Sequence, residues 1–198
     1  MRGLRKYLTP FAPDQSGAVS VLYELGGIIV ICDAGGCTGN VCGFDEPRWF
    51  ERKSAVFSAG LRDMDAILGR DDRLVAKLVD AVEKIDASFA AIVGTPVPAV
   101  IGTDYRALRR MCEKKTDLPI LAIDTDGMEL YDKGEEKAYL ELFTIFAKEK
   151  YEVCKEKVGI LGMTPQDVSD LKAADKVREK LKKEGKEAIC YGMGDGLE

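Results

Sequence analysis

Short apolar runs alternate along the chain with longer stretches in which apolar residues recur at helical spacing. Five of these runs have the length and continuity of strands that are buried on both faces. They cover residues 27–32 (GIIVIC), 88–95 (SFAAIVGT), 119–125 (PILAIDT), 158–163 (VGILGM) and 187–191 (EAICY). Continuous apolar strands of this kind are typical of a parallel sheet that carries helices on both of its faces.

The stretches between these runs predict the helices. Asp14 is expected to cap a helix that runs through Val19, Leu22 and Leu25 and stops at two glycines. Further helices are predicted over residues 71–85, 103–115, 135–151 and 172–184. Strands separated by helices of this length need right-handed crossovers. The predicted fold class is therefore α/β: a three-layer, Rossmann-like parallel sheet with helices on both faces.

The same pattern predicts a domain boundary. Residues 1–156 contain three of the predicted strands with their helices and are expected to form an N-terminal α/β (Rossmann-like) domain. Residues 157–196 hold one strand–helix–strand unit, which is too small to bury both of its faces. We therefore expect this segment to be the start of a second α/β domain, or an extension of the first, that is truncated. Residues 197–198 resemble a cloning remnant.

The composition narrows the classes of function. Lysine and arginine number 29 against 34 aspartates and glutamates, so the net charge of −5 argues against a nucleic-acid or membrane-surface partner. No apolar run reaches the roughly 18 residues of a membrane span, and no signal-peptide pattern follows the basic first residues. We therefore expect a cytoplasmic protein. Histidine is absent, which excludes triads and dyads that need an imidazole.

Three of the six cysteines gather in one short stretch. Cys32, Cys37 and Cys42 follow a C-x4-C-x4-C spacing, at the end of the first strand and in the glycine-rich segment 33–43, which is predicted as a loop. Open parallel sheets bind ligands at the carboxyl ends of their strands, and thiolates favour iron–sulfur clusters or zinc. The spacing alone leaves open a cluster, a zinc site, a thiol redox module and thiols buried in the core.

Three longer stretches occur in an informative order. They read ICDAGGCTGNVCG over residues 31–43, IVGTPVPAVIGTDYRAL over 92–108 and ILAIDTDGMELYDKGEEKA over 120–138. Together they resemble the nitrogenase component 1 family of nitrogenase-like oxidoreductases, and the likeness covers roughly residues 7–163. The chain is therefore interpreted as an N-terminal part of such a protein.

The resemblance implies an iron–sulfur site near Cys37. Cys37 takes the place of a family cysteine that ligates a bridging cluster, expected to be a [4Fe-4S] cluster shared between subunits. Cys32 stands in the place of the family histidine, and both Cys32 and Cys42 lie close enough to Cys37 in sequence to replace the lost metal ligands. Two further contributions complete the candidate cofactor-binding set. Asp14 could supply an oxygen ligand, and the backbone N–H groups of Gly35 and Gly36 could donate hydrogen bonds to the cluster sulfurs.

Two departures from the family pattern matter for this interpretation. Pro96 stands where the second family motif carries a cysteine, and residues 11–16 lack the cysteine that usually precedes the first helix. Of the three cysteine ligands that are usual in the family, the sequence therefore keeps one, Cys37. The resemblance assigns no catalytic residue.

The function implied is that of a nitrogenase component 1-like oxidoreductase subunit, or a fragment of one, that relays low-potential electrons through the cluster. The implied partners are a homologous or identical component 1-type subunit and a separate ATP-hydrolysing iron–sulfur reductase. Two alternatives stay open. One is a cluster-free family member that acts as a binding or scaffold subunit. The other is a zinc or thiol redox module built from Cys32, Cys37 and Cys42.

Overall fold

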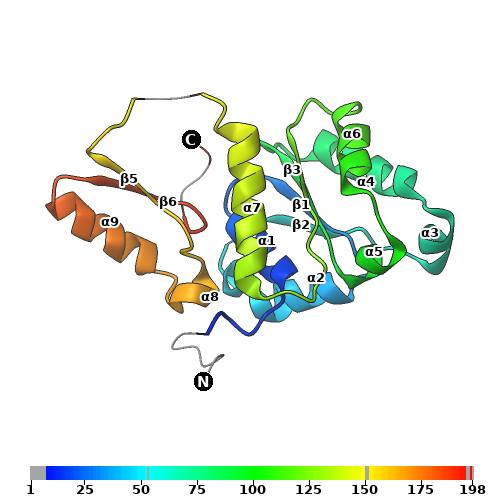
Figure 1. Ribbon diagram of the computed structural model, residues 1–198, viewed down its shortest axis with the longest axis horizontal. Helices are drawn as coiled ribbons and strands as arrows, with labels where there is room; N and C mark the ends of the chain where they lie inside the picture. Colours follow the sequence, from blue (N-terminus) through cyan, green and yellow to red (C-terminus); the bar gives the residue numbers. More distant parts are fainter. Residues whose placement is uncertain (1–7, 53, 150–151, 195–196, 198) are drawn as a thin grey trace, which may run out of the picture.

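The computed structural model describes residues 8–52, 54–149, 152–194 and 197 (Figure 1). Its largest element is a four-stranded parallel sheet in the order β2–β1–β3–β4. The strands are β1 (Ile28–Ile31), β2 (Ala55–Ser58), β3 (Ala90–Val93) and β4 (Ile120–Ile123). The two central strands, β1 and β3, are buried along their whole length, as continuous apolar runs predict.

Helices cover both faces of this sheet, so the predicted three-layer α/β fold is confirmed. One face carries α1 and α7, which lie side by side, and the other carries α4 and α6 (Figure 1). The bounds of these helices are Asp14–Leu22 for α1, Tyr131–Phe146 for α7, Asp71–Lys84 for α4 and Tyr105–Glu113 for α6.

The alternation of side chains along β1 divides the interior into two cores. Ile29 and Ile31 pack with residues of α1 and α7. Ile28, Val30 and Cys32 pack with residues of α4 and α6. Cys32 therefore belongs to the core on the α4–α6 side of the sheet.

Glycines set the close approach of α1 and α7. A Cβ atom added at Gly134 would lie 1.6 Å from the backbone oxygen of Asp14, and one at Gly17 would lie 2.1 Å from the backbone oxygen of Tyr131. No side chain fits at either position, so the two helices pack backbone against backbone.

Short helical segments follow the strands at their carboxyl ends. After β1 the chain forms α2 (Gly36–Asn40), the π-helical turn η1 (Val41–Asp45) and the 3-10 turn η2 (Pro47–Phe50). The loop predicted over residues 33–43 is therefore wrong. The carboxylate of Asp33 accepts hydrogen bonds from the backbone N–H (2.7 Å) and hydroxyl (2.9 Å) of Thr38, which stabilises the start of α2. The remaining short helices are α3 (Asp63–Leu68), α5 (Pro96–Ile101) and α8 (Pro165–Val168).

The last part of the chain forms a second, smaller sheet. Its parallel strands β5 (Lys157–Ile160) and β6 (Glu187–Cys190) are joined by α8 and by α9 (Ala173–Lys183). This unit has its own small core, and it lies beside α7, where the Tyr139 hydroxyl donates to the backbone oxygen of Tyr191 at 2.6 Å. The division into domains at residue 156 stays a prediction.

The five predicted strands all form, but several element boundaries differ. The helix predicted over 135–151 begins earlier, at Tyr131, and ends at Phe146; residues 150–151 lie outside the described residues. Pro13, not Asp14, precedes the first turn of α1, and Asp14 is its first helical residue. Among the described residues, no helix is long and apolar enough to cross a membrane.

Candidate functional site

Two segments that are far apart in the chain meet at the carboxyl edge of the sheet, where the sequence places the candidate site. The carboxylate of Asp14, at the start of α1, accepts hydrogen bonds from the backbone N–H groups of Asp126 (3.0 Å) and Gly127 (2.7 Å), in the turn after β4. Pro13 and Leu130 pair in an isolated β-bridge beside it. The start of α1 is thereby fixed to the turn that leads into α7.

Asp14 is buried, and its carboxylate has a structural role. Burial raises the pKa of Asp14, while the backbone hydrogen bonds from the turn and the charge of Lys137 oppose that shift. Both carboxylate oxygens accept hydrogen bonds from the turn. An oxygen ligand from Asp14 would have to give up at least one of these bonds.

Cys37 is the half-buried cysteine of the cluster. It lies in the first turn of α2 and packs against the α1–α7 core. The side chain of Thr95, after β3, acts to lower the pKa of its thiol. The Thr95 hydroxyl also donates to the backbone oxygen of Cys32 at 2.6 Å, which joins the ends of β1 and β3. Burial, with a contribution from the charge of Asp33, raises the pKa of the Cys37 thiol.

Cys32 and Cys42 are placed differently. Cys32 is buried on the α4–α6 side of the sheet, opposite the core against which Cys37 packs. Burial raises the pKa of Cys32 to about 12, and burial near Glu46 raises that of Cys42 to about 11. Within the described part of the chain, no three or more Cys, Asp or Glu side chains gather into a group that could hold a metal ion. The structure thus does not bring the three cysteines together.

Gly35 and Gly36 lie beside Cys37 in open space. Gly35 has a φ of 118°, which an L side chain rarely adopts, so this glycine allows the chain to turn from β1 into α2. A Cβ atom added at either glycine would meet no atom within 4 Å. The backbone here is accessible, as donors to a bound group need to be.

The neighbourhood of Pro96 contains an unpaired polar atom. A Cβ atom at Gly127 would lie 2.5 Å from the Pro96 ring and 3.1 Å from Oε1 of Gln15, so the three residues are in close contact. Gln15 Oε1 is buried and has no hydrogen-bond partner among the described residues. The region where the family pattern expects a second cysteine is thus filled by a proline ring and an amide.

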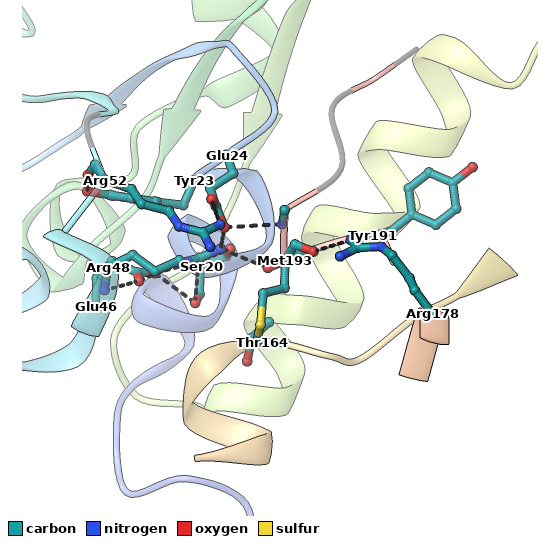
Figure 2. Close-up of polar contacts among 12 residues, drawn as sticks. Ser20, Tyr23, Glu24, Glu46, Arg48, Arg52, Thr164, Arg178, Tyr191 and Met193 are labelled. Atoms are coloured by element: carbon teal, nitrogen blue, oxygen red, sulfur yellow. Dashed lines mark hydrogen bonds and ion pairs between the residues drawn. The ribbon is translucent and has the colours of Figure 1, made fainter. Parts of the chain in front are cut away.

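Sequence reasoning missed a buried arginine that lies just beyond η1. Arg48 is fully buried, and its guanidinium donates to both carboxylate oxygens of Glu46 at 2.7 Å and to Glu24 at 2.9 Å (Figure 2). It also donates to the backbone oxygens of Ser20 (2.6 Å) and Gly192 (2.8 Å). Burial acts to lower the pKa of Arg48, but Glu46 and Glu24 outweigh it and raise the pKa.

This arginine joins the two sheets of the molecule. Gly192 lies in the turn after β6, and the next two residues of that turn also form hydrogen bonds (Figure 2). Arg178 donates to the backbone oxygen of Met193 at 2.9 Å, and the backbone N–H of Gly194 donates to the carboxylate of Glu24 at 3.2 Å. The segment that carries the cysteines is therefore tied to the C-terminal unit. In the sequence, only the proximity of Glu46 and Arg48 indicates this network, because the other partners of Arg48 are up to 144 residues away.

A second buried polar network connects α7 with α8. The hydroxyl groups of Tyr131 and Thr164 are 2.8 Å apart, and Thr164 donates to Asp167 at 3.0 Å. Glu135 lies in the same network, and burial together with the neighbouring Asp167 raises its pKa above the usual value. Its Oε1 atom has no hydrogen-bond partner among the described residues.

These residues fit an iron–sulfur cluster only in part. A cluster needs four thiolate or equivalent ligands, and the described chain offers one soft donor, Cys37, at an accessible edge. Cys32 faces the opposite core, and Asp14 is engaged by the backbone. Cys37 fits as one ligand of a cluster whose other ligands come from elsewhere. The set does not fit a cluster held by this chain alone.

The fold and this edge define a class: a doubly wound parallel α/β domain, with its candidate site at the carboxyl ends of its strands and a second sheet attached beside α7. The family model of nitrogenase component 1 type oxidoreductase matches residues 15–191. The chain therefore belongs to the nitrogenase component 1 type oxidoreductase family.

Solved structures support the same fold. A chain of "Nitrogenase Cp1 at pH 5" matches with a TM-score of 0.74 and 19% identity, over 99% of this chain and 41% of that one. A chain of "Nitrogenase Cp1 at pH 6.5" matches with a TM-score of 0.71 and 18% identity, over 96% and 39%. The chain thus spans about two fifths of the nitrogenase chains that it matches. No curated protein matches the sequence significantly.

Proposed function

We propose that this chain is an electron-relay subunit, or part of one, of a component 1-type oxidoreductase. Cys37 is its ligand to an iron–sulfur cluster, and a second component 1-type chain, homologous or identical, completes the site. When bound, the cluster supplies one-electron transfer at low potential. A separate ATP-hydrolysing iron–sulfur reductase delivers the electrons. Thiolate chemistry of this kind belongs to a reducing compartment, so the proposal includes a cytoplasmic location.

The position of Cys37 is the observation that carries this proposal. It is the half-exposed member of the three clustered cysteines and lies at the carboxyl edge of a parallel sheet, next to the Thr95 side chain. Open space surrounds the neighbouring glycines, whose N–H groups suit hydrogen bonding to sulfide. Open α/β sheets bind ligands at this edge.

Exposed apolar side chains at the carboxyl edge of the sheet support the need for a second chain. Phe44 of η1 is 80% exposed, and Met128, in the turn bonded to Asp14, is 82% exposed. Val97 follows Thr95 closely in the chain and is also exposed. Exposed apolar residues on the three segments that follow β1, β3 and β4 indicate a surface that another protein covers.

Iron and sulfide analysis tests the proposal. The protein is purified without oxygen, reconstituted with iron and sulfide, and examined by metal analysis, visible absorption and electron paramagnetic resonance. We expect a reducible cluster that Cys37→Ser abolishes and that the matched control Cys154→Ser leaves intact, because Cys154 is an exposed cysteine before β5. A cluster that survives Cys37→Ser, or a folded and paired chain that takes up no iron, would overturn the proposal.

A cluster-free binding or scaffold subunit is the second candidate function. The observation that favours it is that the positions of two expected ligands at the carboxyl edge of the sheet are already occupied. The Pro96 ring packs on Gly127, and the Asp14 carboxylate accepts hydrogen bonds from the backbone. On this interpretation the chain keeps the family fold and its association surface, and Cys37 packs as a neutral thiol. Stable pairing without iron would support this function. The zinc or thiol module is not favoured, because Cys32 and Cys37 pack on opposite sides of the sheet.

A further inference from the structure

A buried carboxylate lies at the carboxyl edge of the sheet, two residues beyond β1. Asp33 is only 1% exposed, and its carboxylate oxygens accept three hydrogen bonds. Two come from Thr38 in α2, through its backbone N–H (2.7 Å) and its hydroxyl (2.9 Å). The third comes from the hydroxyl of Ser58, at the end of β2 (2.6 Å), and the backbone oxygen of Asp33 accepts from the N–H of Leu61 (2.8 Å). Asp33 thereby connects the end of β2 with the residue that follows Cys37.

These contacts are those of an ionised carboxylate. Every side-chain hydrogen bond is donated to Asp33, and a carboxyl group that only accepts is the ionised form. Within the described part of the chain, no lysine or arginine side chain pairs with it. Burying a carboxylate without a cation is costly, and residues that break a packing rule in this way are expected at functional sites.

The charge of Asp33 acts on all three clustered cysteines. Burial is the main cause of the raised pKa at Cys37, Cys32 and Cys42, and Asp33 contributes to the rise in each of them. Because Cys37 precedes Thr38 in the chain, the two hydrogen bonds from Thr38 also hold this charge close to Cys37. A fixed negative charge beside a thiol attracts cations and repels anions.

We propose that Asp33 is the positioning and specificity-determining residue of the Cys37 site. Its carboxylate fixes the start of α2, and its charge makes the site selective for cationic groups over anionic ones. A metal cation belongs to the favoured class, and so does the cationic iron–sulfide core of a cluster. A negative charge beside such a core disfavours an added electron, so it lowers the reduction potential.

This inference rests on the proposed function in one respect: it takes Cys37 as the ligand. The position and the sign of the Asp33 charge are properties of the metal-free chain, so they are tested without a cluster.

Alkylation of the metal-free chain with two reagents tests the proposal. Iodoacetate is an anion and iodoacetamide is neutral, and both react with the thiolate. The ratio of their rates at Cys37 is therefore independent of how much of the thiol is ionised, and it reports the local charge. Peptide mass spectrometry reads Cys37 separately from the other cysteines. In Asp33→Asn, the ratio of the iodoacetate rate to the iodoacetamide rate should rise roughly fivefold, because the repelling charge is removed.

Two control variants separate charge from structure. Asp33→Asn keeps the size of the side chain and an oxygen that accepts from the N–H of Thr38. Thr38→Val removes one hydrogen bond to Asp33 but keeps its charge, so it should change both rates together and leave their ratio unchanged. Asp45→Asn removes another carboxylate of the same segment, at the end of η1, where it binds Ser16 and Asn40. It should also leave the ratio unchanged.

An unchanged ratio in folded Asp33→Asn, or an equal rise in Thr38→Val, would overturn the proposal. Circular dichroism checks that each variant is folded. If Asp33→Asn does not fold, the wild type decides: the ratio at Cys37 should be roughly threefold lower in the folded chain than in urea, and equal ratios would contradict the proposal.

Reconstitution with iron and sulfide is measured separately, so the two proposals fail in distinguishable ways. A cluster that forms through Cys37 should have a higher midpoint potential in Asp33→Asn than in the wild type. A cluster whose potential and alkylation ratio do not respond to Asp33→Asn contradicts the role of Asp33 alone. An alkylation ratio that rises in Asp33→Asn, in a chain that never takes up iron, contradicts the cluster alone.

Discussion

Replacing Arg48 tests how firmly the cysteine-bearing segment is joined to the C-terminal unit. The substitution Arg48→Met keeps much of the side-chain volume but removes every donor of the guanidinium. It leaves the buried carboxylate of Glu46 with the Ser20 hydroxyl and a backbone N–H as its donors, while Glu24 keeps its ion pair with Arg52. The backbone oxygen of Gly192 loses its donor as well.

The expected loss of stability follows from these contacts. Breaking a buried ion pair by removing one partner costs about 3–5 kcal/mol, because the other charge stays buried without its ionic partner. The side chain of Arg48 is fully buried and that of Glu46 is 1% exposed, so solvent screening reduces this figure little. We therefore expect Arg48→Met to cost about 4 kcal/mol, a large part of the 5–15 kcal/mol typical of a domain. Adding Glu46→Gln should restore part of it, since the stranded charge is removed.

Urea unfolding and hydrogen exchange measure the two consequences. The free energy of unfolding should fall in Arg48→Met, and the amides of β5 and β6 should lose more protection than those of β1 and β3. Arg70→Met serves as control, because Arg70 forms an exposed ion pair with Asp72. A loss below about 1 kcal/mol, or equal loss of protection in both sheets, would refute the argument that Arg48 joins them.

Three further outcomes are expected. Burial and the neighbouring Asp167 raise the pKa of Glu135 well above its usual value of about 4.5, so stability that is present below about pH 4.5 is lost as the pH rises. In urea unfolding, Glu135→Gln should therefore exceed the wild type in stability by about 2 kcal/mol at about pH 8 and by nothing at about pH 4. Gly134→Ala should lower the free energy of unfolding by about 3 kcal/mol or more, because the added Cβ meets the backbone of α1. Gly36→Ala adds its Cβ in open space and should leave the stability measured by thermal unfolding unchanged. Alkylation followed by peptide mass spectrometry should label exposed Cys154 first and buried Cys32 only slowly, and rapid labelling of Cys32 would contradict its burial.

The sequence pattern predicts the fold where elements are long or fully buried. It misses β2 because this edge strand is half-exposed, with Phe57 open to solvent, so no continuous apolar run marks it. It also misses α5 and α8. Both begin with a proline at the first helical position, Pro96 and Pro165, which is a signal that was available. Helices of four to six residues leave too little periodicity to detect by spacing.

The candidate site is only partly predictable for a different reason. The parity of strand positions in β1 already assigns Cys32 to the face of Ile28 and Val30, so its separation from Cys37 could have been expected. The role of Asp14 could not, because its carboxylate binds backbone 112 and 113 residues away. Contacts at such separation depend on how the helices pack, and no local spacing encodes them.

The protonation of Cys37 connects the two candidate functions physically. A cysteine binds metal as the thiolate, and burial already raises the pKa of Cys37. A second chain over this edge would bury the thiol further and favour its neutral form. Only a strongly bound cation could then hold the thiolate, because its charge offsets the lost hydration. Pairing by itself therefore favours a neutral Cys37 and a scaffold, whereas pairing with ligands supplied by the partner favours a cluster. The fold of this chain accommodates both, so the ligands on the opposite surface decide between electron relay and scaffold.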